Sequence, residues 1–399
     1  MDGLQPRRHR RRVRPAARRP AGRRRHRPRH PGGGPGMSTE SSGQRNTAAP
    51  RSRTRPARKS AAASAGTGMS QVAERAGVAM SSVSRVLSGH ADVSEAMRAR
   101  VMAAVEELGY QPNMLAQMLR RGATRTVGFV VGDISNPLLS QIALGAETTL
   151  RASDYALLLA NSVNDPRLDA ENIQLLHQRR VDGFLLSLSD ETSEQTAEAV
   201  ARTDTPTILI DRDLPTRAPT SAVLSDHRAG ITRAVEHLVG LGHERITLIA
   251  GSPHVRPTRE RIDALEEALE DSPGVVAQVR PGAFTEAHGR AATRDLLDGR
   301  RPPTAIIAGG NQILVGVLAE LAAREIRIPH DLSLVTCDDV PLAQFFTPAL
   351  ATIRRDPYEM GATAARLLLA RLGGAADEVA TLPTQFSAAS SCAPPRPRQ

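Results

Sequence analysis

A short segment beginning at Met80 combines hydroxyl side chains with an arginine in a pattern suited to nucleic acid. It reads MSSVSRVL, and Val83, Val86 and Leu87 fall on one face at helical spacing. The exposed face would carry Met80, Ser81, Ser82, Ser84 and Arg85. An arginine can donate two hydrogen bonds to a guanine, and a serine can bond either a base or a phosphate. The segment therefore predicts a helix whose exposed side chains contact DNA.

A preceding helix is needed to position that segment. Val72, Ala73 and Ala76 recur at helical spacing, and the pattern breaks at Gly77 before resuming. Two short helices joined by a Gly-Val-Ala turn are typical of a helix-turn-helix, whose second helix enters the major groove.

A third helix is predicted over residues 95–108. Ser94 is its expected N-cap, and Gly109 follows its end. Its apolar stripe comprises Met97, Val101, Ala104, Val105 and Leu108. Three helices of this kind can enclose a small core.

The segments VAERAGVAMSSVSRVLSG and VSEAMRARVMAAVEELGYQPNMLAQMLRRG resemble the DNA-binding headpiece of the lactose-repressor/galactose-repressor (LacI/GalR) family of bacterial transcription factors. The AGV turn, the VSRVL helix and the LGYQPN connector occur in the family's order and spacing. The resemblance implies a hinge helix after the connector, with Asn113 at the DNA, Ala116 close to it and Leu119 wedged into the minor groove. Packing of Leu115 and Leu119 against the ligand domain is the alternative.

Two positions depart from the family pattern. Members usually carry a hydroxyl residue ahead of each of the first two helices, where this chain has Gly68 and Ala79. Because loss of a helix cap typically costs about 1 kcal/mol, we expect reduced headpiece stability or affinity.

From Arg125 onward, apolar segments alternate with amphipathic ones. The expected strands are TVGFVVG, YALLLAN, VDGFLLSL, PTILID, ERITLIAG, TAIIAGG and LSLVTCDD. Such alternation predicts βαβ units with parallel sheets covered by helices, an α/β fold. About 270 residues of this pattern favour two similar lobes with a ligand in the cleft between them.

This region resembles the family's two-lobed, periplasmic-binding-protein-like domain, so that the likeness spans about 330 of 399 residues. It implies that the effector-binding residues are Asn136, Asp211, Arg261, Asp338 and Arg355. Carboxylates and guanidinium groups suit a polyol, since each can engage two hydroxyls. Two alternatives are a turn salt bridge between Asp211 and Arg212 and a surface charge at Arg261. Gly310-Asn311 stands where many members have Asn-Asp, so the effector's identity does not transfer.

Basic residues gather at the start of the chain. The net charge is +10, yet residues 1–59 hold 19 basic and two acidic residues, and the remainder carries a net −7. We expect residues 1–66 to form a disordered Arg/Pro/Gly-rich tail, either a basic arm for phosphates or an upstream extension without a role. The expected domains that follow are the helix-turn-helix (67–111), the hinge (112–123) and the effector-binding and dimerisation domain (124–399).

Other function classes lack support in the sequence. No phosphate loop, dinucleotide fingerprint, nucleophile elbow or HExxH is present, so we expect no enzyme activity, no cofactor and no metal. No apolar run is long enough for a membrane span and no export signal fits, which predicts a cytoplasmic protein. The resemblance thus implies a homodimeric regulator, of the repressing type usual in the family, that binds double-stranded operator DNA under control of a sugar-like effector. A solute-binding protein without regulatory DNA binding is the alternative, which the headpiece disfavours.

Overall fold

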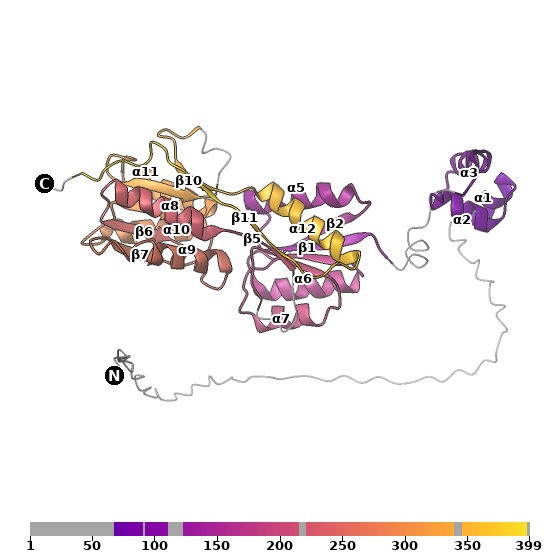
Figure 1. The fold of residues 1–399 in the computed structure, drawn as a ribbon, viewed down its shortest axis with the longest axis horizontal. Coiled ribbons are helices and arrows are strands. Elements are labelled where there is room, and N and C mark those ends of the chain that lie inside the picture. The colour runs from indigo at the N-terminus through magenta and orange to yellow at the C-terminus, as the bar shows by residue number, and fades with distance from the viewer. Residues whose placement is uncertain (1–67, 91, 111–122, 215–220, 339–344, 397–399) are drawn as a thin grey trace, which may run out of the picture. The chain divides into compact units, whose positions relative to one another are not determined.

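The computed structural model describes residues 68–90, 92–110, 123–214, 221–338 and 345–396. Within these ranges the chain forms a small helical headpiece and two α/β lobes (Figure 1). This arrangement confirms the predicted fold class. None of the helices in the described ranges is long and apolar enough to cross a membrane.

The headpiece consists of α1 (Met69–Ala76), α2 (Met80–Leu87) and α3 (Glu95–Glu107). Their apolar faces meet in one core whose buried members are Val72, Ala73, Ala76, Val83, Val86, Val101, Ala104 and Tyr110. Gly77 ends α1 in the left-handed region at φ 63°, where glycine has no Cβ to clash. Glycine at position 77 therefore allows the sharp turn between α1 and α2.

The helix caps of the headpiece differ as the sequence predicts. Ser94 accepts a hydrogen bond from Met97 N and caps α3, whereas Ala79 offers α2 no side-chain cap. At α1, Gly68 has no side chain, but its N–H donates to Gln71 Oε1 at 3.0 Å. The start of α2 thus lacks the side-chain cap that Ser94 gives α3.

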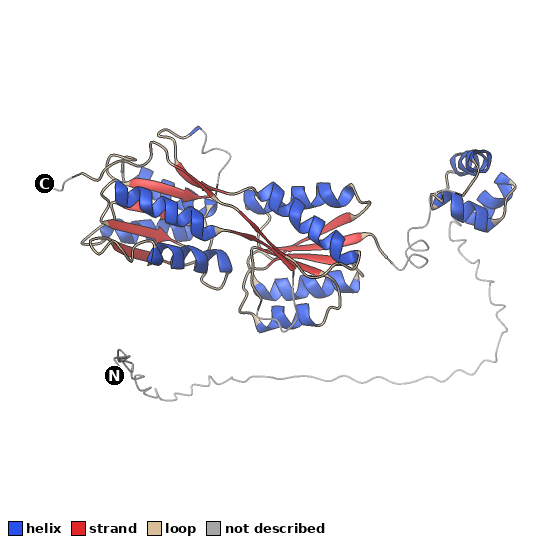
Figure 2. Cartoon of the chain, in the orientation of Figure 1, coloured by secondary structure: helices blue, strands red, loops and turns tan. Residues whose placement is uncertain are grey.

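The first lobe contains a six-stranded sheet in the order β11-β5-β4-β3-β1-β2, with all pairs parallel (Figure 2). Its strands are β1 (Thr126–Val131), β2 (Ala156–Asn161), β3 (Gly183–Ser187), β4 (Thr207–Ile210), β5 (Ser221–Ser225) and β11 (Val379–Leu382). Its helices are α5 (Pro137–Arg151), α6 (Pro166–Gln178), α7 (Glu194–Ala201) and α12 (Pro357–Leu372).

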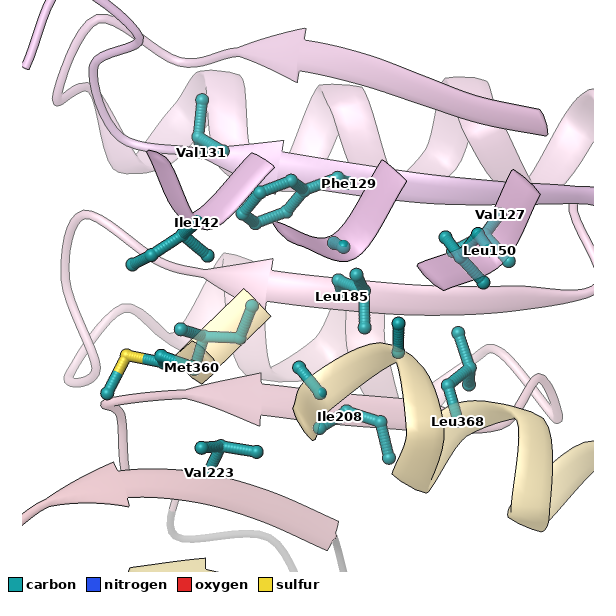
Figure 3. Close-up of a cluster of buried hydrophobic side chains, with 14 of the residues drawn as sticks. Val127, Phe129, Val131, Ile142, Leu150, Leu185, Ile208, Val223, Met360 and Leu368 are labelled. Atoms are coloured by element: carbon teal, nitrogen blue, oxygen red, sulfur yellow. The ribbon is translucent and has the colours of Figure 1, made fainter. Parts of the chain in front are cut away.

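Side chains of alternate strand positions fill the two faces of this sheet. Val127, Phe129 and Val131 of β1 pack against α5 and α12 (Figure 3). Val130 points to the other face, into the cluster that contains residues of α6 and α7. Because both faces are covered, these strands read as nearly continuous apolar runs.

The second lobe repeats this plan in the order β12-β10-β9-β8-β6-β7, where only the β10–β12 pair is antiparallel. Its strands are β6 (Arg245–Ile249), β7 (Val276–Arg280), β8 (Ala305–Ala308), β9 (Ser333–Cys337), β10 (Ala351–Arg354) and β12 (Gln385–Ser387). Its helices are α8 (His227–Gly240), α9 (Arg256–Glu267), α10 (Glu286–Asp298) and α11 (Asn311–Ala323).

Three chain crossings join the lobes. The chain leaves β5 in the first sheet and enters α8, which packs in the core of the second lobe. It returns from β10 to α12, which covers the first sheet, and the third crossing runs from β11 to β12. Helices α12 and α5 lie side by side (Figure 1), and a Cβ at Gly145 would come within 2.0 Å of the Tyr358 carbonyl oxygen. The close approach of these helices therefore requires glycine.

All seven strands expected from the sequence are present. The described ranges contain five more, namely β5, β7, β10, β11 and β12. Of these, β7, β11 and β12 lie at sheet edges, where the apolar signal is weak.

Replacing Ala79 with serine should strengthen the start of α2. A serine hydroxyl can accept a hydrogen bond from a first-turn amide and contribute about 1 kcal/mol. We therefore expect amide hydrogen exchange in α2 of Ala79→Ser to slow about fivefold relative to the unmodified protein. Unchanged exchange would show that the alanine cap costs nothing.

Candidate DNA interface and effector cleft

Helix α2 exposes the side chains expected to contact DNA. Met80, Ser81 and Arg85 are exposed, while Ser82 and Ser84 are half-buried. Val83 and Val86, on the opposite face, lie in the headpiece core. One face of α2 thus presents two exposed polar side chains beside an exposed methionine, which a major groove can accept. The hinge residues Asn113, Ala116 and Leu119 lie outside the described residues, and their roles stay predictions.

The five expected effector residues meet at one open cleft. The first lobe contributes Asn136 and Asp211, the second contributes Arg261 and Asp338, and Arg355 lies in the crossing from β10 to α12. The rest of the lining is partly apolar and includes Leu138, Leu139, Ile142, Ile210, Pro257 and Phe284. The cleft thus combines converging charges with apolar walls.

Asp211 and Asp338 occupy equivalent places in the two lobes. Each follows directly after a strand, β4 or β9, and each adopts a positive φ, 54° and 68° respectively. Each donates its backbone N–H to the neighbouring strand, to Val223 O at 2.7 Å and to Ile353 O at 3.0 Å. Aspartate tolerates this left-handed conformation better than most residues. Both carboxylates therefore lie at carboxyl ends of strands, where ligands of α/β proteins bind.

Arg355 links these two carboxylates. Its Nη1 lies 2.5 Å from Asp211 Oδ2, and its Nε lies 2.6 Å from Asp338 Oδ1. A second bond, from Nη2 to Asp338 Oδ2 at 3.2 Å, makes the contact with Asp338 bidentate. All three side chains are at most 7% exposed. Burial alone would lower the pKa of Arg355, but the two carboxylates outweigh it and raise the pKa above its usual value.

The carboxylate of Asp211 has little capacity for further donors. Its Oδ1 accepts from Ser225 N at 3.1 Å and from Arg256 Nη1 at 3.2 Å. Its Oδ2 accepts from Arg355 and from His227 Nε2 at 2.8 Å. A carboxylate offers about four acceptor sites, so these donors occupy them. Asp338, by contrast, receives two hydrogen bonds from Arg355, and Arg261 Nη2 lies 3.7 Å away.

The protonation states around Asp211 follow from this environment. Burial would raise the pKa of Asp211, but interactions with His227 and Arg355 outweigh it and hold the pKa well below the usual range. Burial lowers the pKa of His227 to about 4, despite the nearby carboxylate. At neutral pH the imidazole is therefore uncharged and donates its Nε2 hydrogen to ionised Asp211.

The structure contradicts both alternative interpretations, a surface charge at Arg261 and a turn salt bridge between Asp211 and Arg212. Arg261 is 3% exposed and donates to Gly309 O at 2.7 Å, so it is not a surface charge. Arg212 donates to Leu188 O and to the backbone oxygen of Asp211, and no carboxylate of the described residues lies within 4.0 Å of it. Burial lowers the pKa of Arg212, and the nearby acids offset only part of this decrease. This guanidinium in the cleft wall is suited to hydroxyl oxygens.

Sequence reasoning missed Arg212 and Phe284 as cleft residues. Phe284 follows β7, and a Cβ at Gly251 would come within 2.1 Å of its ring, so the ring fills the space above that glycine. Had the segment VAQVR been recognised as a strand, the residues after its end would have been candidates. Arg212 was signalled only by its place next to Asp211.

Asn136 contacts the opposite lobe. It caps α5, and its Oδ1 also accepts from Asn311 Nδ2 at 2.7 Å. Beside this contact, Gln312 Nε2 donates to Asp133 Oδ2 at 3.3 Å. The Gly310-Asn311 departure thus places an asparagine across the cleft from Asn136. In the ranges that the structure describes, no group of three or more His, Cys, Asp or Glu side chains could hold a metal ion.

Comparisons with known proteins agree with this geometry. Residues 68–113 match the profile of bacterial regulatory proteins of the lacI family, and residues 235–392 match a periplasmic binding protein-like domain. The chain is 33% identical over 307 residues to the ribose operon repressor of Escherichia coli K12, covering 76% of this chain and 92% of that repressor. The chain therefore belongs to the LacI family, whose members are DNA-binding transcriptional regulators.

Solved structures extend the likeness. A lac repressor dimer bound to operator and the anti-inducer ONPF matches with a TM-score of 0.73 and 26% identity, over 82% of this chain and 99% of that one. A LacI family regulator from Enterococcus faecium with bound ribose matches with a TM-score of 0.61 and 28% identity, over 68% and 100% respectively. This protein is thus a transcriptional regulator with a headpiece and an effector domain.

Stability should depend on pH through His227. Its folded pKa of about 4 lies below the unfolded value near 6.5, so the unfolded chain binds the proton first as pH falls. The stabilisation is complete above pH 6.5 and is lost towards pH 4, by roughly 3 kcal/mol. His243, whose pKa burial also lowers to about 4, acts in the same window. In urea denaturation, His227→Gln should therefore show about half the loss of stability between pH 6.5 and 4. An identical loss would contradict the buried, neutral imidazole.

Proposed function

We propose that this protein represses transcription from an operator and that a neutral monosaccharide, ribose or a close relative, bound in the cleft controls its affinity for that operator. The observation that carries the proposal is that one chain holds both an exposed recognition helix and a cleft with converging carboxylate and guanidinium groups. A solute-binding protein for transport would have no use for the first of these.

The charges of the cleft favour an uncharged ligand. Three acids and three bases line it, namely Asp133, Asp211, Asp338, Arg212, Arg261 and Arg355. Because these formal charges cancel, a phosphate or carboxylate on the ligand would leave an excess of negative charge. Hydroxyl groups can instead donate to Asp338 and accept from Arg212 and Arg261. The ring of Phe284 offers an apolar surface for the carbon face of a sugar.

Known relatives support the choice of sugar. Curated relatives include ribose operon repressors of Escherichia coli and Bacillus subtilis, and the Enterococcus faecium structure contains ribose. In this proposal Asn136 and Arg355 complete the binding site, and Asp211 holds Arg355 in place.

A homodimer is part of the same proposal. The lac repressor structure is a dimer on its operator. In this chain, β2 is an edge strand that exposes Leu158 and Leu159 by 41% and 40%, and α5 beside it exposes Leu144 by 49%. Exposed apolar side chains of this kind suit an interface with a second copy. The protein would act in the cytoplasm, where bacterial DNA lies, by binding rather than by catalysis.

The DNA-binding proposal is tested by selecting operators with the purified full chain. We expect a palindrome of two half-sites, one for each headpiece of a dimer. Arg85→Ala should weaken binding to the selected operator roughly 10- to 100-fold, since a bidentate base contact contributes about 1–3 kcal/mol, and leave nonspecific binding nearly unchanged. Arg202→Ala removes a surface arginine of the effector domain and serves as the control. Equal loss in specific and nonspecific binding would contradict base recognition by Arg85.

The effector proposal is tested by calorimetry with D-ribose. Asp338→Asn should weaken binding roughly 10- to 100-fold, because a hydrogen bond to a charged acceptor contributes about 1.5–3 kcal/mol. Asp298→Asn, which alters an exposed ion pair of the same lobe, should bind ribose like the unmodified protein. No heat from ribose or from a panel of related sugars would refute the monosaccharide proposal.

A further inference from the structure

The N-terminus of α9 lacks a cap of its own. Its N-cap residue is Val255, which is 1% exposed and offers no side-chain hydrogen bond. In the same domain, α5, α7 and α8 are capped by Asn136, Ser193 and Asp226 of their own sequence. Pro257 has no N–H, and the N–H groups of Thr258 and Arg259 donate to Val255 O. The N–H of Arg256 therefore needs an acceptor from outside the helix.

A carboxylate of the other lobe supplies one. Glu191, on the segment that follows β3, accepts from the backbone N–H of Arg256 at 2.8 Å. Its second oxygen accepts from Arg259 Nη2 at 2.6 Å, and its own N–H donates to His254 O at 3.0 Å. The Glu191 carboxylate is 4% exposed. Negative charge at a helix N-terminus also interacts favourably with the helix dipole.

Neighbouring groups strengthen this contact between lobes. Asp190 Oδ2 lies 2.9 Å from His254 Nδ1, and Asp213 Oδ2 lies 3.5 Å from Arg259 Nη2. Arg256 reaches back to Asp211 at 3.2 Å. Acids of the first lobe thus meet bases at the start of α9, and these charges can pair only while the lobes are together.

Helix α9 also carries two residues of the cleft wall, Pro257 and Arg261. We propose that Glu191 is a positioning residue that caps α9 across the cleft and thereby couples closure of the lobes to the placement of Arg261. The coupling increases affinity for an effector that Glu191 does not touch. The predicted effect of Glu191 on sugar binding rests on the function proposed above. The cap that Glu191 gives α9 does not depend on that function.

The cap is tested first without any ligand, by hydrogen exchange of the full chain. Glu191→Ala should speed exchange of the Arg256 amide of α9 about tenfold, because this amide loses its charged acceptor. Glu191→Gln, which keeps the shape but loses the ion pair with Arg259, should show a smaller increase and guards against misfolding of the alanine variant. Glu198→Ala is the matched control, since that acid follows on α7 of the same lobe and pairs with Arg202 within its own helix.

Coupling is tested next with D-ribose. Glu191→Gln and Arg259→Gln should each weaken binding about three- to tenfold, and the double variant should be no weaker than the worse of the two. Additive losses, or exchange in Glu191→Ala equal to that in Glu198→Ala, would overturn the proposal. A third outcome separates the two proposals. If neither the unmodified protein nor any variant binds ribose, but amide exchange at α9 is faster in Glu191→Ala, the cap is supported and the sugar proposal is wrong.

Discussion

The bridge from Asp211 through Arg355 to Asp338 is the interaction on which the effector domain depends. The two acids end strands of different sheets, and Arg355 lies in a crossing that connects those sheets. Burying three charges is expensive, and removal of one partner from a buried pair commonly costs about 3–5 kcal/mol. The cost is met here because each charge is paired and hydrogen-bonded. The bridge therefore holds the ends of β4 and β9 together across the cleft and sets the charge that the cleft presents to a ligand.

The backbone conformation of the two aspartates and a hydrogen bond from His227 support this bridge. The positive φ angles of Asp211 and Asp338 place both carboxylates beyond the ends of their strands, at a conformational cost of about 1–2 kcal/mol each. The neutral imidazole of His227, at the start of α8, donates to the Asp211 oxygen that also accepts from Arg355. Since α8 follows the first crossing and Arg355 lies in the second, two of the three crossings converge on one carboxylate. The consequence is that the acceptor positions of Asp211 are occupied within the protein, whereas Asp338 has fewer donors of its own, which is why our proposal assigns ligand hydroxyls to Asp338.

The sequence predicted the elements that carry strong periodicity. The headpiece helices and the seven apolar strands show a pattern that few other structures produce, and resemblance to a family located Asp211, Arg261, Asp338 and Arg355 at the cleft. The strands β5 (SAVLS), β7 (VAQVR) and β10 (ATIR) were missed because polar residues limit their apolar runs, whereas the equally short β4 and β8 read TILI and AIIA. With β7 unrecognised, Phe284 could not be placed. The cap that Glu191 gives α9 joins residues 65 positions apart and has no local signature at all.

Charge illustrates how composition and structure answer different questions. The excess of basic residues at the start of the chain suggests affinity for phosphate, which every DNA sequence offers equally. Between residues 69 and 121, six arginines face five acids, so the segment that resembles the headpiece is nearly neutral. Within α2 the one basic side chain is Arg85, among serines that can bond bases or phosphates. Net charge attracts every DNA sequence alike, so discrimination between operators is expected from contacts with the bases and from DNA shape and not from charge.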